Sequence, residues 1–289
     1  MQFFDSCAKA ILSCMETQTY SLAHLLSSEH TLDMHIHDCH EVYYSISGGK
    51  KFLINNHLYS FEPGDIFFIN HSESHHLLQV EEAKHERYVI NIHPRFIQMY
   101  SSASTDLGAC FDSSNHPYGH KLSLTPKEQQ RFLFLMHKLS SLDTTDFGAD
   151  IMEHLAFMEL MLFFNELFSS KHHSPEKPSA TGKHYKTTNE IITYINQNLT
   201  KDLSLSNLSK QFSMSDSHLN RIFKAETGTT LQKYIVGQRV ALAKELLSDG
   251  HTVTEVFALS GFGDYSNFYR TFTKIVGISP KNYAINSTK

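Results

Sequence analysis

The chain has 289 residues, of which 40% are hydrophobic and 19% are charged, and its formal net charge at pH 7 is -5. This composition excludes a disordered chain, because it supplies enough apolar side chains for buried cores, and the length suggests about two domains. The sequence has no run of about 18 apolar residues and its four cysteines form no C-x-x-C pair, which argues against a membrane helix and a disulfide framework. We therefore expect a cytoplasmic protein without a membrane partner.

The charge is divided unevenly along the chain. Residues 183–289 hold 13 lysines and arginines against 8 acidic residues, whereas the remainder holds 12 against 22. Histidine is distributed the other way, because 17 of the 20 histidines lie in the acidic part. Two regions that differ this much in charge and histidine content should have different functions. The basic region favours a polyanionic partner.

Residues 30–95 alternate apolar and polar side chains in short runs that are separated by turn signals, as in HEVYYSISGG and EPGDIFFINHSES. This is the pattern of several short strands packed in a sandwich or a barrel. We expect residues 1–120 to form a β-barrel domain.

Beyond this region the apolar residues follow the period of helices. Thr125 is predicted to be an N-cap, with Pro126 at the first helical position and Glu128 completing a capping box. A second helical segment carries two apolar stripes: Ile151, Leu155, Met158 and Leu162 on one, and Phe157, Met161, Phe164 and Phe168 on the other. A helix that is apolar on two sides needs two partner surfaces, so residues 121–168 are predicted to hold a homodimer.

Residues 169–183 are polar and contain two prolines and a glycine, as a linker does. Short helices are predicted after it, the first over Asn189–Asn198. Ser206 is expected to cap the next helix, which a tight turn joins to a helix over Asp216–Thr227 that ends at Gly228. Two short helices joined in this way form a helix-turn-helix, whose second helix can enter a major groove.

The same design then repeats after a long helix, which is predicted over Leu231–Ser248. Thr252 and Glu255 form a second capping box, a turn with two glycines follows, and the last recognition-type helix is predicted over Asp264–Val276. The segments RIFKAETG and RTFTKIVG align as an internal repeat. We therefore expect residues 184–289 to form an all-α domain with two helix-turn-helix units.

Residues 187–289 resemble the DNA-binding module of the AraC/XylS family of transcription regulators. The segments LSLSNLSKQFSMSDSHLNRIFKAETGTTLQKYI and GFGDYSNFYRTFTKIVGISPKNY carry the resemblance. It implies a regulator rather than an enzyme, with double-stranded promoter DNA as its partner and RNA polymerase as a further possible one. In that family a rigid central helix joins the two units, so that one monomer reads two adjacent major grooves. Two positions depart from the family pattern: Phe257 replaces a small alanine, and Ala284 replaces an arginine.

The outward positions of the two recognition-type helices are the candidate DNA-binding residues. In the first helix, Leu219, Ile222 and Phe223 follow the i, i+3, i+4 spacing of a buried face, which leaves the other face outward. Arginine paired with guanine is the commonest specific contact to a base. The resemblance and this spacing together select Ser217, Asn220, Arg221, Lys224, Ser266, Asn267, Tyr269 and Arg270.

A second constellation lies in the N-terminal region. His35, His37 and Glu41, followed by Gly48, the turn Pro63-Gly64-Asp65 and His75, match the spacing of the two motifs of the cupin barrel. In a strand His35 and His37 point to the same face, and three imidazoles with a carboxylate can hold a divalent transition metal. Sensor domains of the AraC type often carry the same histidines without a metal, as part of a small-molecule pocket.

The ligand therefore stays open between an organic effector, with a sugar as the first expectation from the resemblance, and a metal ion. Protonation of the abundant histidines and oxidation of Cys39 are two further ways of sensing, and a cupin enzyme fused to a DNA-binding module is the remaining alternative. The expected fold is α+β and multidomain: a cupin-like β-barrel (1–120), a helical dimerisation segment (121–168), a linker (169–183) and an all-α domain with tandem helix-turn-helix units (184–289).

Overall fold

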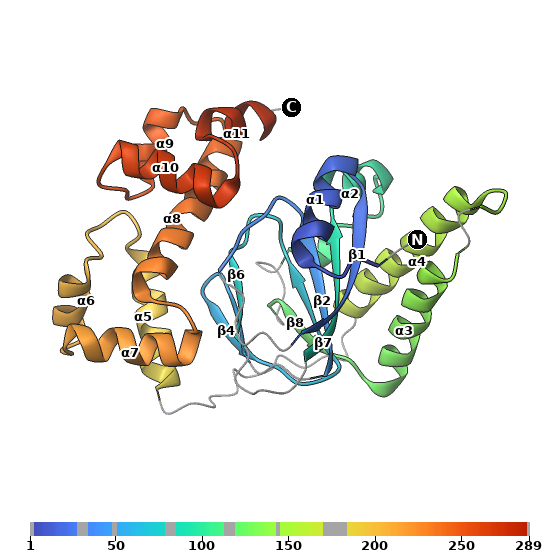
Figure 1. The fold of residues 1–289 in the computed structure, drawn as a ribbon, viewed down its shortest axis with the longest axis horizontal. Coiled ribbons are helices and arrows are strands. Elements are labelled where there is room, and N and C mark those ends of the chain that lie inside the picture. Colours follow the sequence, from blue (N-terminus) through green and yellow to red (C-terminus); the bar gives the residue numbers. More distant parts are fainter. Residues whose placement is uncertain are drawn as a thin grey trace.

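The computed structural model describes residues 3–27, 34–47, 51–78, 85–112, 119–142, 145–169 and 184–287. A β-rich N-terminal domain packs beside an all-helical C-terminal domain, as Figure 1 shows, and this confirms the predicted fold class. Gly48 of the cupin-type motif and nearly all of the predicted linker lie outside the described residues.

The N-terminal domain consists of two antiparallel sheets that follow the short helix α1 (Cys7–Thr17). The larger sheet has the order β1 (Tyr20–Ser27), β7 (His85–Ile92), β2 (His40–Ser47), β5 (Asp65–Ile69) and β8 (Lys121–Ser123). The smaller sheet has the order β4 (His57–Ser60), β3 (Lys51–Ile54) and β6 (His75–Leu78). Strand β8 lies just beyond residue 120, so the larger sheet extends past the predicted end of the barrel domain.

Strand alternation divides the side chains of this domain among separate cores. Inward residues such as Tyr43, Phe52 and Phe67 fill the space between the sheets, where their ring centroids lie 5.0–6.0 Å apart. The outer face of the larger sheet packs against helices, whereas Leu53 and Leu58 on the smaller sheet belong to a core shared with the C-terminal domain. Each sheet is thus covered on its outer face, by a different part of the chain.

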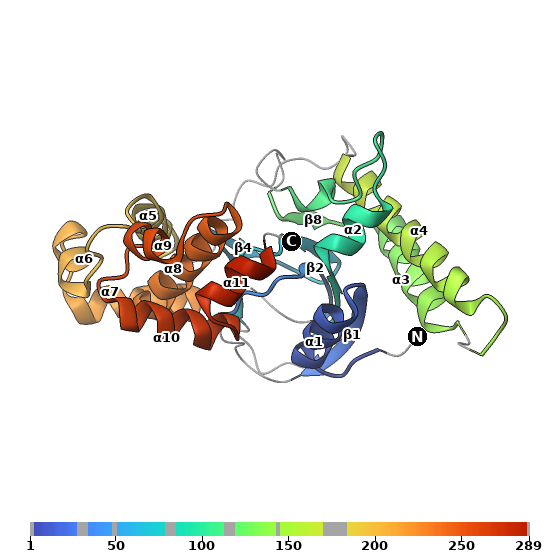
Figure 2. The ribbon, with the colours of Figure 1, turned by 90° about the horizontal axis from the view of Figure 1, so that it is seen from above.

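The helices on the larger sheet are α3 (Pro126–Ser140) and α4 (Ala149–Ser169), with α2 (Pro94–Tyr100) and the short turn η1 (Ala109–Phe111) beside them. Thr125 and Glu128 form the predicted capping box. Figure 2 shows α3 and α4 on the side of the barrel that faces away from the C-terminal helices. None of the helices in the described ranges has the length and apolar character that crossing a bilayer requires.

The C-terminal domain contains α5 (Tyr185–Gln197), α6 (Leu205–Gln211), α7 (Asp216–Thr227), α8 (Leu231–Ser248), α9 (Val253–Leu259), α10 (Tyr265–Val276) and α11 (Pro280–Ser287). The predicted bounds of α7 and α8 are confirmed, and so is the Thr252 capping box of α9. The predicted cap Ser206 is wrong, because α6 already begins at Leu205 and the extended backbone that marks a cap is found at Ser204. Helix α8 carries one helix-turn-helix unit at each end (Figure 1).

Candidate functional site

The structure brings the four candidate ligands of the N-terminal domain together at one place. His35 and His37 lie in the extended segment before β2, Glu41 lies in β2 and His75 begins β6. One ligand atom from each residue lies within 4.8 Å of the others. The same carboxylate oxygen of Glu41 is 3.2 Å from Nε2 of His37 and 3.6 Å from Nε2 of His75. We call this set the His–Glu cluster.

His75 reaches the cluster by a route that the sequence did not indicate. The turn at Gly64, whose φ is +94°, leads into β5, which pairs with β2. His75 lies one strand later, on β6 of the opposite sheet. His75 meets the other candidate ligands because its backbone pairs with that of His35, through two N–H to O=C hydrogen bonds of 3.1 and 3.0 Å.

Two of the imidazoles in the cluster are held in one orientation by the backbone. Nδ1 of His37 donates to the carbonyl oxygen of Cys39 and Nδ1 of His75 donates to that of Glu73, each over 3.0 Å. Because a carbonyl group can only accept, Nδ1 carries the proton in both rings, and in a neutral ring the lone pair is therefore on Nε2. Metal-binding histidines have this arrangement, in which a backbone partner fixes the tautomer and the ring.

Two of the four residues of the cluster are buried, His35 and His37 are partly buried, and their charges are coupled. Glu41 is 4% exposed and His75 is 1% exposed. Burial raises the pKa of Glu41, but the neighbouring imidazoles of His75 and His37 outweigh it and hold that pKa well below its usual range. Burial lowers the pKa of His37. The carboxylate therefore stays ionised, and a buried anion of this kind needs a positive partner, either an imidazolium or a metal ion.

The composition of the His–Glu cluster suits one class of ion. Three imidazole nitrogens and one carboxylate oxygen are ligands for a divalent transition metal such as Zn²⁺ or Fe²⁺, whereas Ca²⁺ and Mg²⁺ take oxygen ligands. The residues present therefore fit a transition metal.

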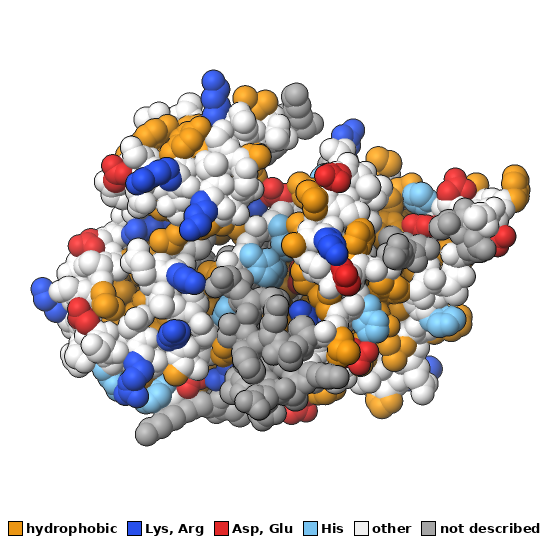
Figure 3. Space-filling view, in the orientation of Figure 1, with side chains coloured by type: hydrophobic (Ala, Val, Ile, Leu, Met, Phe, Trp, Pro, Cys, Tyr) orange, Lys and Arg blue, Asp and Glu red, His pale blue; other side chains and the backbone are white. Residues whose placement is uncertain are grey.

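The second candidate site is the outer face of the two recognition-type helices. On α7 and α10 the apolar residues Leu219, Phe223, Phe268 and Phe272 are fully buried. The opposite faces are exposed at Ser217, Arg221, Lys224, Ser266, Asn267, Tyr269 and Arg270. Lysine and arginine side chains gather over the C-terminal domain in the space-filling view of Figure 3. This face offers the charge and the access that a nucleic acid needs.

Several of the predicted DNA-binding side chains also make contacts within the protein. Asn220 is half-buried, and its Oδ1 accepts a hydrogen bond of 3.2 Å from the backbone N–H of Leu231, at the start of α8. Nη2 of Arg221 lies 2.9 Å from Nδ1 of His218, and Nε of Arg270 donates a hydrogen bond of 3.3 Å to the backbone oxygen of Ser266. Asn220 therefore has a structural task that the sequence reasoning missed, whereas both arginines remain exposed.

A close pair of thiols also escaped the sequence analysis. Cys14 in α1 and Cys39 before β2 are both fully buried, and their Sγ atoms are 3.1 Å apart. The two residues are far apart in sequence, so spacing alone gave no signal for the contact.

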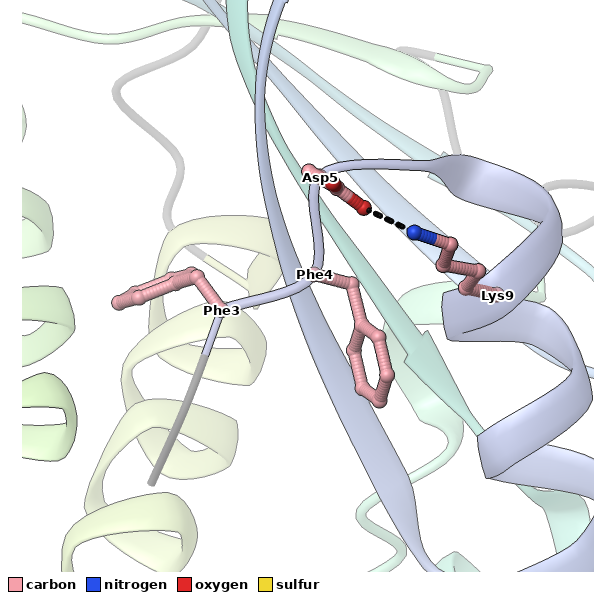
Figure 4. A pocket seen from close by; sticks show the side chains of 4 residues that line it. All are labelled: Phe3, Phe4, Asp5 and Lys9. Atoms are coloured by element: carbon pink, nitrogen blue, oxygen red, sulfur yellow. Dashed lines mark hydrogen bonds and ion pairs between the residues drawn. The ribbon is translucent and has the colours of Figure 1, made fainter.

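A hollow of about 300 Å³ at the N-terminus is lined by Phe3, Phe4, Asp5 and Lys9. Figure 4 shows the ion pair between Asp5 and Lys9, 2.9 Å long, at this hollow. None of its four lining residues belongs to either candidate site.

Comparison with known proteins identifies both regions. The family described as AraC-like ligand binding domain matches residues 23–161, and the helix-turn-helix domain family matches residues 208–285. The chain is 25% identical over 250 residues to the HTH-type transcriptional activator RhaS of Salmonella schwarzengrund, and the match covers 86% of each chain. It is 33% identical over 94 residues to the probable transcriptional regulator LumQ of Photobacterium leiognathi, which covers 32% of this chain and 38% of LumQ.

Other relatives are longer or more distant. An uncharacterized HTH-type transcriptional regulator of Staphylococcus aureus is 25% identical over 241 residues, which is 82% of this chain but only 30% of that protein. Among solved structures, ToxT of Vibrio cholerae aligns over 92% of this chain and 98% of its own, with 13% identity and a TM-score of 0.37. RhaS, LumQ and the staphylococcal protein are all named as transcriptional regulators or activators, which is the class of protein that the sequence predicted. The two matched families together span most of the chain, which belongs to the AraC family of helix-turn-helix transcriptional regulators.

Proposed function

We propose that this chain is a sequence-specific DNA-binding transcription regulator that responds to a small ligand held in its N-terminal domain. The observation that carries the proposal is the pair of exposed recognition-type helices, α7 and α10, at the two ends of α8. Two such helices on one rigid connection can enter successive major grooves of double-stranded promoter DNA. In a regulator that activates transcription, RNA polymerase is the further partner.

The test is binding of the full chain to the DNA upstream of its own gene. Fluorescence anisotropy should show saturable binding whose affinity falls steeply as salt rises, because phosphate contacts release counterions. A DNA of equal length and shuffled sequence should bind more weakly. Absence of binding at low salt, with or without added Zn²⁺, would contradict the proposal.

We further propose that the ligand of the His–Glu cluster is a divalent transition metal. The fixed Nδ1 protons of His37 and His75 favour this candidate, because each ring, when neutral, has its lone pair on the Nε2 atom that lies near the carboxylate of Glu41. When bound, the metal would supply the positive charge that the buried carboxylate needs. The first expectation, a sugar, rests on the family resemblance alone.

Metal binding can be tested on the full chain without an affinity tag that contains histidine. Titration with Co²⁺ should give the visible absorption bands of a nitrogen- and oxygen-coordinated ion at one equivalent, and Zn²⁺ should displace it. The variant with His35, His37 and His75 all changed to Ala should show no bands. A response of DNA binding to an organic effector that survives this triple substitution would place the sensing site elsewhere.

A homodimer through α3 and α4 is the third part of the proposal. One predicted stripe of α4 packs on the barrel, where Phe157 and Phe164 are fully buried. Three of the four residues of the other stripe face outward, with Ile151 61%, Leu155 58% and Leu162 53% exposed, while Met158 packs against the core. A contiguous apolar face of this kind is costly to leave in water, and a second copy of the same face can cover it.

Sedimentation of the wild type should give a dimer at micromolar concentration. The double variant Leu155→Lys/Leu162→Lys should sediment as a monomer with an unchanged circular dichroism spectrum. Met99→Lys is the matched control, because Met99 is 64% exposed but lies on α2. A monomeric wild type would contradict this part of the proposal and leave the other two intact.

A further inference from the structure

The extended segment 34–38 has two faces with different partners. Its odd-numbered residues, His35 and His37, point into the His–Glu cluster. Its even-numbered residues, Met34, Ile36 and Asp38, contact the C-terminal domain. This is the alternation of an extended chain, and it places metal ligands and interdomain contacts one residue apart.

The contacts of the even-numbered residues are made mostly with α8. Met34 packs closely on Gly237. A Cβ atom added to Gly237 would lie 2.7 Å from the sulfur of Met34. Ile36 is 7% exposed and belongs to the core that contains Val240 and Leu247. The N-terminal segment therefore contributes an apolar side chain to the core of the second helix-turn-helix unit.

Asp38 adds polar contacts at the end of the segment. Its Oδ1 lies 2.7 Å from Nζ of Lys244 on α8 and accepts a hydrogen bond of 3.0 Å from the hydroxyl of Tyr283 on α11. Lys244 is only 1% exposed, so the ammonium end of this ion pair is withdrawn from water. Breaking it would leave a buried ammonium group without its partner, which is costly.

The strand that supplies the third imidazole repeats the pattern. His75 of β6 points into the cluster, while the next residue, His76, and Leu78 point outward and approach Gly228, between α7 and α8. Just before β6, Oγ of Ser74 accepts a hydrogen bond of 2.9 Å from Nε2 of Gln238 on α8. The two segments that hold His35, His37 and His75 are therefore the same segments that dock against the C-terminal domain.

We propose that a metal ion in the His–Glu cluster strengthens the docking of the N-terminal domain on α8, and that docking in turn strengthens metal binding. This inference depends on the proposed metal site. Residues 34–38 belong to no regular strand, and their backbone pairing within the described chain is the single bridge from His35 to His75. Ligation of His35 and His37 would fix the segment on both sides of Ile36 and next to Asp38.

The docked arrangement leaves the recognition faces free, since Arg221, Lys224 and Arg270 are exposed in it. Metal-dependent docking would therefore not cover the DNA-binding surface. It would set the orientation of α7 and α10 relative to the rest of the chain. Thermodynamic linkage requires the coupling to be reciprocal, so it can be measured from the metal side alone.

The experiment measures the Zn²⁺ affinity of the full chain by competition with a chromogenic chelator. The double variant Gly237→Leu/Gln238→Ala weakens docking from the side of α8 without touching a ligand residue. We expect its Zn²⁺ affinity to fall about fivefold or more, the lower end of typical coupling between sites. Gln232→Ala is the matched control, because Gln232 lies on the exposed face of the same helix, and its affinity should equal that of the wild type.

Amide hydrogen exchange of the wild type provides a second readout that does not depend on a variant. Zn²⁺ should slow exchange in α8 and α11, and it should not do so in the variant His37→Ala. If the wild type binds Zn²⁺ but the double variant binds it equally well and exchange in α8 is unchanged, the coupling is wrong and the metal site stands. If the wild type binds no Zn²⁺, both the metal site and the coupling fall, while the DNA-binding proposal is unaffected.

Discussion

The two candidate sites of this protein differ in exposure. The residues proposed to bind DNA project from α7 and α10 into solvent, and the buried faces of the same helices form the core. The proposed metal ligands project inward, and Glu41 and His75 are almost inaccessible. A substitution on the exposed site should therefore change binding and leave stability unchanged, whereas one in the buried site should change both.

The difference has a physical origin. A base edge and a phosphate are parts of a large partner, so the side chains that contact them must be exposed on the protein surface. A small ion is bound best where water is excluded and where backbone groups hold each ligand in place, as the carbonyl groups of Cys39 and Glu73 hold His37 and His75. The first kind of site can be identified from a surface pattern, but the second depends on how distant strands meet.

The largest expected effect belongs to the buried site. His37→Ala should lower Zn²⁺ affinity by about 100-fold or more, because even partners of metal ligands cost about 10–100-fold when removed. A chelator should lower the melting temperature of the wild type, since metal binding free energy stabilises the fold, and it should leave the variant unchanged.

The control for this prediction is His57→Ala, since His57 is an exposed histidine on β4 outside the cluster. It should retain the Zn²⁺ affinity of the wild type. A variant at His37 that binds Zn²⁺ as tightly as the wild type would show that the cluster is not the metal site.

The next largest effect belongs to the exposed site. Arg221→Ala and Arg270→Ala should each cost about 1–3 kcal/mol of discrimination at one base pair, because arginine reads guanine through two hydrogen bonds. Neither should move the melting temperature, since both side chains are exposed. Binding selections with randomised DNA measure the first quantity and calorimetry the second. A uniform loss over all DNA sequences would mean that the arginine contacts phosphate instead.

The sequence predicted best those features that depend on neighbours along the chain. The capping boxes at Thr125 and Thr252, the end of α7 at Gly228 and both bounds of α8 follow from residues that lie within one or two helical turns. The cap at Ser206 failed because the sequence offers a serine at 204 as well as at 206, and local pattern does not choose between them.

Contacts between distant segments were harder to predict. The four residues of the His–Glu cluster were found because cupin-type spacing brings them together, but the route of His75 through the opposite sheet was not predicted. The Cys14–Cys39 contact and the docking of Ile36 and Asp38 on the C-terminal domain have no local signal. Cysteine, isoleucine and aspartate side chains occur in many other environments, so only the packing of the whole chain shows which contacts these four residues make.

Asn220 should break the simple division between exposed and buried sites. Its hydrogen bond to the N–H of Leu231 satisfies one of the free donors at the start of α8. Asn220→Ala should therefore cost about 1 kcal/mol of folding stability, as the loss of a helix cap does. Ser217→Ala, one turn earlier on the exposed face of α7, should cost nothing measurable in chemical denaturation. If the two variants are equally stable, Asn220 contributes nothing to folding, and DNA binding is its only proposed role.

The smallest effect is a pH dependence that originates in the N-terminal domain. Burial, aided by the charge of Arg87, lowers the pKa of His85 to about 4, and its Nε2 is 2.6 Å from the hydroxyl of Tyr43. An unfolded histidine has a pKa of about 6.5. Between these pH values the unfolded chain binds a proton that the folded chain does not. The stability that His85 contributes is therefore fully present above pH 6.5 or so and is lost as the pH falls toward 4.

His85→Gln isolates this contribution, because glutamine can still hydrogen-bond to Tyr43 but does not titrate. The melting temperature of the wild type should fall between pH 7 and pH 5, and that of the variant should fall less. Comparing the two pH values within each protein removes the cost that the substitution has at neutral pH. The reduction should be partial, since burial also lowers the pKa of His40 and His71 in the same domain. A variant whose melting temperature falls as steeply as that of the wild type would show that acid acts on the protein through other groups.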